Sequence, residues 1–119
     1  MPKTISAVRV AIHKVASDDD KIVARATIGE GQEGAWSMHL DDKFIKGGTA
    51  PEDVKLGTAR KLRGSLLEVS AVIKDVRKET DRLTLTARVT PGETKPKAKI
   101  SQSGDPGDNA TYSIVIHFV

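Results

Sequence analysis

Three glycines in the segment "ATIGEGQEGAW" have the spacing at which dinucleotide-binding proteins hold a pyrophosphate. Gly29, Gly31 and Gly34 form G-x-G-x-x-G directly after a strand-like run. In that fold the glycines let the backbone approach the phosphates at the start of a helix, which leads into a second, parallel strand. Here Glu30 and Glu33 lie inside the glycine segment, where their carboxylates would repel phosphate. We therefore interpret the segment as a turn between two strands, with glycines that allow positive φ.

Carboxylates gather in two turn-like segments, where they could bind a cation. The segments "ASDDDK" and "SGDPGDN" contain Asp18, Asp19, Asp20, Asp105, Asp108 and Asn109. Calcium takes six to eight oxygen ligands, so the two segments could form a site if they lay at the same end of the molecule. The spacing D-x-D-x-D-G of a calcium loop is missing. We predict turns with solvated carboxylates and no cofactor; a calcium-dependent or small-ligand-binding module is the alternative.

The three histidines offer imidazole groups for metal binding or proton transfer. His13 and His117 fall on the polar faces of the first and last predicted strands, so their rings could meet if those strands were neighbours. Zinc would require further ligands that no spacing indicates. We therefore predict exposed surface histidines.

Catalytic signatures are missing from the chain. It has no G-x-S-x-G segment and no cysteine, which excludes a thiol nucleophile, disulfides and thiolate metal sites. An unrecognised active site, our third reading, would need a pocket lined by His39, Asp41, Asp42 or Arg60. We predict a protein that is not an enzyme, and we assign no catalytic, cofactor-binding or metal-ligating residue.

Positive charge is concentrated in the middle of the chain. The net charge is +3, from 19 basic and 16 acidic residues, while residues 55–99 hold 12 basic and 5 acidic residues, a difference of 12 − 5 = +7. Nucleic-acid modules combine such charge with aromatic side chains that stack on bases. Residues 55–99 contain no aromatic residue, so only unspecific attraction to phosphate is left. We do not expect nucleic acid to be a partner.

Side chains that alternate between apolar and polar indicate β-strands along most of the chain. The segments "SAVRVAIHKV" and "KIVARATI" predict one antiparallel hairpin, in which Val8, Val10 and Ile12 share the apolar face of the first strand. The segments "SLLEVSAVIKDV" and "RLTLTARVT" predict a second hairpin, closed by the polar turn "KETD". "TYSIVIHFV" predicts a last strand, with a short strand "KAKISQ" before it.

These strands predict an all-β protein with one domain, residues 1–119. Two layers must cover each other's apolar faces, so we expect an antiparallel β-sandwich of 6–8 strands, immunoglobulin-like or jelly-roll, with a small β-barrel as second choice. Residues 41–64 lack a clear strand pattern and contain Pro51 after Thr49. We predict a long loop there, with a helical turn that starts at Pro51.

A regular scaffold without catalytic residues favours a binding or assembly module. We expect it to contact a protein partner or a second copy of itself through a sheet edge and the 41–64 loop. Several valines on nominally polar faces could form an apolar patch for such a contact: Val23, Val72, Val76, Val115 and Val119. No signal peptide and no apolar run of membrane-spanning length occur, so we expect a cytoplasmic protein without membrane contact; an exported mature domain is the alternative.

Overall fold

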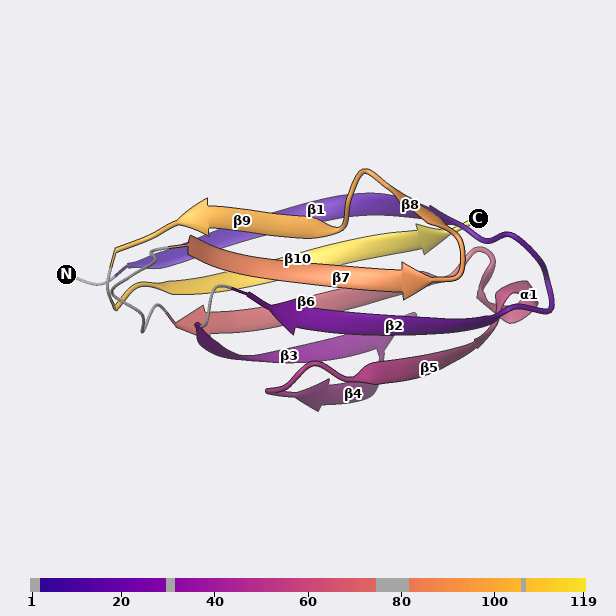
Figure 1. Cartoon of the computed structure of the whole chain (residues 1–119), viewed down its shortest axis with the longest axis horizontal. Coiled ribbons are helices and arrows are strands. Elements are labelled where there is room, and N and C mark those ends of the chain that lie inside the picture. The colour runs from indigo at the N-terminus through magenta and orange to yellow at the C-terminus, as the bar shows by residue number, and fades with distance from the viewer. Residues whose placement is uncertain (1–2, 30–31, 75–81, 106) are drawn as a thin grey trace.

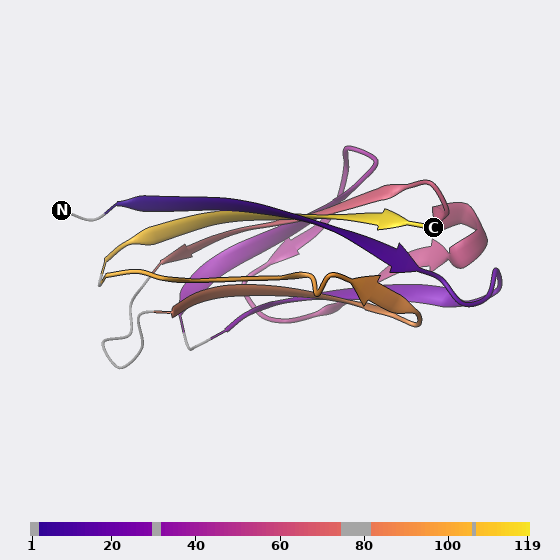
Figure 2. The same cartoon turned by 90° about the horizontal axis from the view of Figure 1, so that it is seen from above.

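The fold consists of two β-sheets that face each other. A computed structural model describes residues 3–29, 32–74, 82–105 and 107–119. Figure 1 looks onto one sheet with the other behind it, and Figure 2 shows the two layers from above. The sheets do not close into a barrel. The all-β, sandwich-like prediction is therefore confirmed, and the barrel of second choice is not found.

The larger sheet has six strands in the order β4-β3-β6-β10-β1-β8. They are β1 (Thr4–Lys14), β3 (Glu33–Leu40), β4 (Lys43–Gly48), β6 (Leu66–Lys74), β8 (Glu93–Lys95) and β10 (Asn109–Phe118). The first and last strands, β1 and β10, run parallel, whereas the other pairs are antiparallel. The prediction of a purely antiparallel sandwich is thus wrong at this one pair.

The smaller sheet has four antiparallel strands in the order β5-β2-β7-β9. They are β2 (Lys21–Ile28), β5 (Asp53–Thr58), β7 (Arg82–Thr90) and β9 (Lys99–Ser103). A single helical turn, α1 (Ala59–Leu62), follows β5. No helix in the described part of the chain is long and apolar enough to cross a membrane.

Both predicted hairpins are wrong, because consecutive strands belong to different sheets. β1 lies in the six-stranded sheet and β2 in the other, and the same holds for β6 and β7. Each predicted hairpin therefore consists of two strands that lie on opposite sides of the core. Alternation in the sequence shows that a strand buries one of its faces. Both sheets present an apolar surface to the core, so this alternation does not show which strand is the hydrogen-bonded neighbour. The "KETD" turn lies outside the described residues.

The predicted 41–64 loop is also wrong, since this segment forms β4, β5 and α1. Asp41 and Asp42 have φ of 48° and 67°, which suits the two-residue turn of a tight hairpin between β3 and β4. No helix begins at Pro51; β5 starts two residues later. Gly47 and Gly48 weakened the strand pattern in the sequence. Gly48 lies against the Trp36 ring, which a Cβ atom at this position would approach to 3.4 Å.

The core forms where the inward faces of the two sheets meet. The predicted apolar faces of β2, β6, β7 and β10 are buried: Ile22, Ala24, Ala26, Leu67, Val69, Ala71, Ile73, Leu83, Leu85, Ala87, Val89, Tyr112, Ile114, Ile116 and Phe118. Trp36 and Met38 join them from β3. Removal of these side chains from water supplies the main stabilisation of the sandwich.

The predicted buried face of β1 is the exposed one. Val8, Val10 and Ile12 are 70%, 56% and 51% exposed, while Ala11 and His13 are buried. The strand is apolar on both faces over much of its length, so alternation alone gave the wrong side. His13 is satisfied in the core, with Nδ1 2.6 Å from the Thr94 hydroxyl and Nε2 2.8 Å from the Pro91 carbonyl oxygen.

Tyr112 joins the two sheets by a hydrogen bond inside the core. Its hydroxyl, on β10, donates to the Leu83 carbonyl oxygen of β7 at 2.9 Å, and the side chain is completely buried. Burial also raises the pKa of the Tyr112 phenol above its usual value. The neutral phenol is therefore the form that the folded protein favours.

Replacement of Tyr112 by Phe should lower the free energy of unfolding by about 0.5–1.5 kcal/mol, because the buried hydrogen bond from the phenol to the Leu83 carbonyl oxygen would be lost. Urea denaturation measures this loss. Thr111→Val, which removes an exposed hydroxyl from the neighbouring residue, should change stability by less than about 0.5 kcal/mol. A Tyr112→Phe variant as stable as the wild type would show that the bond contributes nothing.

The same pair has a signature at alkaline pH. Because the folded protein holds the Tyr112 pKa above its unfolded value, the contribution is complete below about pH 10 and decreases as the pH rises further. The difference between wild type and Tyr112→Phe should therefore shrink above pH 10. A constant difference would indicate that this phenol does not ionise on unfolding.

Candidate functional site

The glycine segment forms no phosphate site in the part that the structure describes. The Gly29 N–H donates to the Thr84 carbonyl oxygen at 3.0 Å, and Gly34 lies in β3 rather than at a helix start. A Cβ atom at Gly34 would lie 2.5 Å from the Val72 carbonyl oxygen, so this glycine allows β3 to approach β6. Glu30 and Gly31 lie outside the described residues. A strand follows the segment, as predicted.

Asp18, Asp19 and Asp20 lie in the β1–β2 turn. Asp18 forms a 2.6 Å ion pair with Arg63, which connects the turn to the end of α1. Asp20 accepts a 3.2 Å hydrogen bond from the backbone N–H at position 17, within the turn itself. Asp19 lies 3.8 Å from Arg60 with its side chain 95% exposed, so this carboxylate is solvated, as predicted.

Asp105 and Asp108 lie at the opposite end of the sandwich from the aspartates of the β1–β2 turn. They precede β10, whose first residue pairs with Thr4 at the start of β1, whereas that turn follows the end of β1. The two acidic segments are therefore separated by the length of an 11-residue strand, about 35 Å. The two segments therefore do not meet, as a shared cation site would require. No group of three or more potential metal-ligating side chains is found among the described residues.

The Asp108 side chain instead stabilises the end of the sandwich at which β1 and β10 begin. Its carboxylate accepts hydrogen bonds from the backbone N–H of Asp105 at 2.8 Å and of Lys3 at 2.9 Å. These two bonds lower the pKa of Asp108 below its usual value. The charged form therefore stabilises the end of the sandwich at neutral pH.

The histidines do not come together. β1 and β10 are neighbours, as the meeting of His13 and His117 would require, but His13 pairs with Phe118 and His117 with Ile12. Residues one position apart point to opposite faces of a sheet, so the two rings lie on opposite sides. His117 is exposed as predicted, whereas the prediction of an exposed His13 is wrong.

The pocket suggested for an enzyme forms only in part. His39, Asp41 and Asp42 line a shallow hollow of about 310 Å³ with Leu66, Glu68 and Val115. Asp41 accepts a 2.9 Å hydrogen bond from the Leu66 backbone N–H. Arg60 is not among the lining residues, and its neighbour is Asp19. The hollow brings together a histidine and carboxylates without a nucleophile beside them.

The outer side of the six-stranded sheet is the surface that stands out. All large apolar side chains that are strongly exposed in the described residues lie on it: Val8, Val10, Ile12, Phe44, Leu66, Val72 and Val119. The register places them on one side, since Val10 pairs with Val115 and Ile12 with His117. Residues that pair across neighbouring strands form a row. The apolar face consists of the outward side chains of β1, β10, β6 and β3, from the row Ser6–Thr111–Val72–Ala35 to the row Ile12–His117–Leu66, together with Phe44 and Val119.

Charge is scarce on the apolar face. Its remaining positions are mostly small or hydroxylated: Ser6, Ala35, Ser37, Ser70, Thr111 and Ser113. Glu68 is the one Asp, Glu, Lys or Arg in these rows of the four strands, and it pairs with His39 across β3. A β-surface with so many exposed apolar side chains and a single carboxylate is unusual for a face that only meets water.

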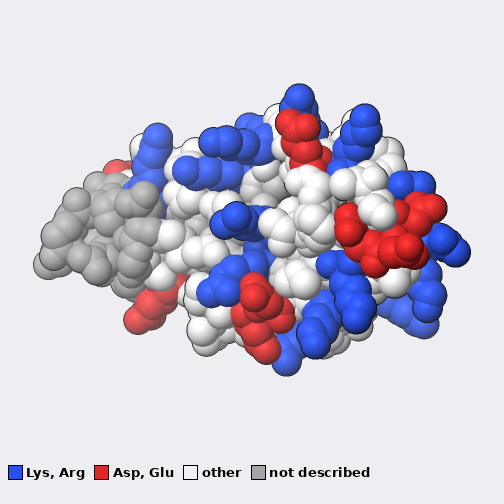
Figure 3. All heavy atoms as spheres, turned by 45° about the vertical axis from the view of Figure 1, so that its right-hand side comes forward, with Lys and Arg blue, Asp and Glu red and all other residues white. Residues whose placement is uncertain are grey.

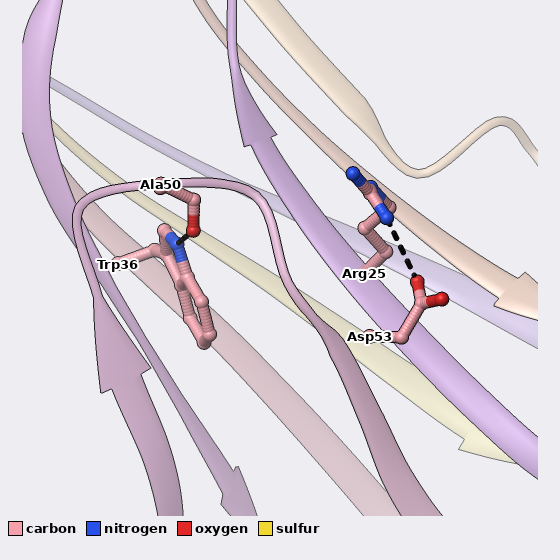
Figure 4. Close-up of polar contacts among 4 residues, drawn as sticks. All are labelled: Arg25, Trp36, Ala50 and Asp53. Atoms are coloured by element: carbon pink, nitrogen blue, oxygen red, sulfur yellow. Dashed lines mark hydrogen bonds and ion pairs between the residues drawn. The ribbon is translucent and has the colours of Figure 1, made fainter.

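The outer side of the four-stranded sheet has the opposite character. Each of its strands contributes outward Lys or Arg side chains, and Figure 3, an oblique view, shows Lys and Arg spread over the described surface, with Asp and Glu in a few clusters between them. Arg25 of β2 forms a 3.1 Å ion pair with Asp53 of β5. Figure 4 shows this pair, and beside it the Trp36 indole, which donates to the Ala50 carbonyl oxygen at 2.9 Å where the chain passes from β4 to β5.

No protein-family model, curated protein or solved structure matches this chain. The two outer faces are therefore the observations from which a function is inferred. Among the valines predicted to form a patch, Val72, Val115 and Val119 do lie on the apolar face, Val23 lies on the other sheet, and Val76 is outside the described residues. The β1 side chains were missed because the pattern assigned them to the core.

Replacement of Asp108 by Asn should lower the melting temperature at pH 7, because a neutral amide accepts the two backbone hydrogen bonds less well. The folded pKa is lowered, so the stabilisation is present above the unfolded value of about 3.9 and is lost as the pH falls through the folded pKa. Thermal melts from pH 7 to pH 2 should show the difference closing in acid. Asp105→Asn, at an exposed carboxylate, is the control; a difference independent of pH would contradict the assignment.

Proposed function

We propose that this protein is a non-catalytic assembly module that associates with a second copy of itself through the apolar face. The observation that carries the proposal is the collection of all strongly exposed large apolar side chains of the described chain on one side of one sheet. Contact with water makes such a surface unfavourable, and burial against a partner recovers that free energy. The finer type of sandwich, immunoglobulin-like or jelly-roll, stays a prediction.

The dimensions of the apolar face suit a small dimer interface. Five adjacent strands span about 20 Å at about 4.8 Å between strands, and the face extends about 27 Å along the strands, from the row of Ala35 to Val119. One copy would thus contribute about 540 Å², or about 1,100 Å² for a pair, which is the size of a weak or transient contact. We expect a reversible dimer.

A second copy fits the face better than a partner with a protruding anchor. The hollows of this face, such as the one of about 240 Å³ between Ser37, Val72 and Thr111, are open to solvent, and two sheets pack at about 10 Å with their strands nearly aligned. Small side chains such as Ser37, Ser70 and Ser113 form the middle row, which allows close approach. The segment 41–64 takes part through Phe44 on β4, and β1, the neighbour of the short edge strand β8, contributes Val8 and Val10.

Replacement of Val10 by Lys should raise the dissociation constant of the dimer by about 100-fold or more, because two lysines per dimer would be removed from water without a partner. Val10 is already 56% exposed, so the monomer should fold normally. Sedimentation equilibrium over a range of concentrations measures the association.

The matched control for this variant is Thr90→Lys, which adds the same charge at an exposed position on the other sheet. It should leave the dimer intact. A wild type that remains monomeric at high micromolar concentration, or equal weakening by both substitutions, would contradict the proposal.

Replacement of Glu68 by Gln should strengthen the dimer. The Glu68 carboxylate lies within the apolar face, so association must remove its charge from water, which a neutral amide of the same shape avoids. We expect a decrease in the dissociation constant of about tenfold, equivalent to about 1.4 kcal/mol. Glu93→Gln, at an exposed carboxylate of β8, is the control. Weaker association of Glu68→Gln would show that the carboxylate has a partner in the dimer.

A further inference from the structure

One basic side chain from each strand of the four-stranded sheet lies on a single diagonal. Arg25 of β2 is directly opposite Arg88 of β7. Lys55 of β5 pairs with the residue two before Arg25, and Lys99 of β9 pairs with the residue two before Arg88. Because β2 and β7 are antiparallel, these two offsets continue in the same direction. We call these four side chains the cationic diagonal.

The cationic diagonal extends across the whole sheet. Neighbouring strands are about 4.8 Å apart, and two residues advance about 6.7 Å along a strand. The steps between neighbouring basic residues are thus about 8, 5 and 8 Å, and the complete line measures about 19 Å. All four side chains are exposed. A linear polyanion that lay across the strands would meet them in succession.

The arrangement carries a cost in the isolated protein. Like charges directly opposite each other on neighbouring strands destabilise a sheet, and Arg25 faces Arg88 in this way. Asp53 offsets part of the repulsion through its 3.1 Å ion pair with Arg25, which Figure 4 shows. Asp53 is the one acidic residue among the outward positions of these strands. A bound anion would relieve the repulsion that remains.

The surface between the basic side chains has two hollows, which threonine side chains help to line. A shallow hollow of about 310 Å³ lies on one side of Arg88, against Arg25, Thr90 and Asp53, whose carboxylate is paired with Arg25. A second hollow of about 490 Å³ lies on its other side, with Thr86, Lys97 and Lys99. Both hollows are open to solvent and share the Arg88 side chain. Arg, Lys and Thr side chains are the groups that commonly contact phosphate oxygens in protein–DNA complexes.

We propose that the cationic diagonal binds the phosphate backbone of double-stranded DNA without sequence preference. One strand of DNA carries a phosphate about every 3.4 Å along the helix axis and makes a turn in about 35 Å, so the diagonal is as long as about half a turn of the duplex. Guanidinium and ammonium groups would contact phosphate oxygens, and the threonine hydroxyls would donate further hydrogen bonds. The binding surface lies on the side of the sandwich away from the apolar face, so this inference does not depend on the proposed dimer.

A duplex fits these side chains better than the other polyanions. The outward positions of this sheet hold no aromatic residue, so single-stranded bases would find no stacking platform. An acidic protein would find no large apolar anchor, since Val23 is the one outward aliphatic side chain of β2 and is half-buried; protein interfaces depend on such anchors. The lack of aromatic residues in the segment 55–99 is an argument against stacking on nucleic-acid bases. It does not argue against contact with the phosphate backbone of DNA.

The test compares two doubly substituted variants that lose the same charge. Lys55→Gln with Lys99→Gln removes two lysines of the cationic diagonal, and Lys43→Gln with Lys74→Gln removes two exposed lysines of the other sheet. Fluorescence anisotropy with a labelled 20-base-pair duplex measures affinity between 25 and 200 mM salt. Circular dichroism and thermal melts verify that both variants fold.

We expect the wild type to bind with a slope of about −3.5 in log K against log salt, from four phosphate contacts. The diagonal variant should lose about two of these contacts, so its slope should fall to about −1.8, with affinity at least tenfold weaker at 50 mM salt. The control variant should keep the wild-type slope. Arg25→Gln with Arg88→Gln should weaken binding at least as much as the diagonal variant.

Four results would overturn the inference. They are no binding at 25 mM salt, equal weakening by the diagonal and control variants, tighter binding to a single strand with the same number of phosphates, and equal competition by poly-glutamate at the same charge concentration. The last result would indicate an acidic protein partner. The dimer proposal is tested separately by Val10→Lys, which should dissociate the dimer and leave the salt slope unchanged.

Discussion

The structure depends on the burial of two inward rows of side chains against each other. Every strand presents alternate residues to the core. Among the strands of the described residues, only β3 and β4 follow each other within one sheet, so the chain passes to the other sheet at every other connection. The Tyr112–Leu83 hydrogen bond joins the layers where a polar group enters this core. Folding thus determines the inward residues and leaves the two outward faces to other requirements. Their composition is therefore the part of the molecule that reports on function.

Alternation in the sequence predicted much of the fold because it records burial on one face of a strand. It identified the strands β2, β6, β7 and β10 and their buried faces correctly. It could not give the partner strands, since both sheets present the same apolar surface to the core. It was wrong on β1, because Val8 and Val10 are as apolar as the inward side chains of this strand. The polar His13 is buried there, and both of its ring nitrogens have hydrogen-bond partners. Tertiary contacts decide such cases.

The candidate surfaces were harder to predict, because each is formed across strands. The cationic diagonal collects residues from Arg25 to Lys99, which are far apart in the sequence, and strand register alone brings Arg25 opposite Arg88. The number of basic residues in the segment 55–99 indicated a positive charge, but it did not show on which face of the sandwich these side chains would lie. The apolar face was foreseen in part, through Val72 and Val119, while the β1 contribution required knowledge of which side of the sheet faces solvent.

The two proposed contacts are geometrically compatible, because they use opposite sides of the sandwich. Sheets pack about 10 Å apart, so two copies joined through the apolar face would form four layers about 30 Å thick. Their cationic faces would then point away from each other, and a straight duplex could contact one of them at a time. Dimer formation would therefore add no contacts to a single duplex. Instead, it would allow one dimer to hold two duplexes, which makes cross-bridging the physical consequence of combining these two faces.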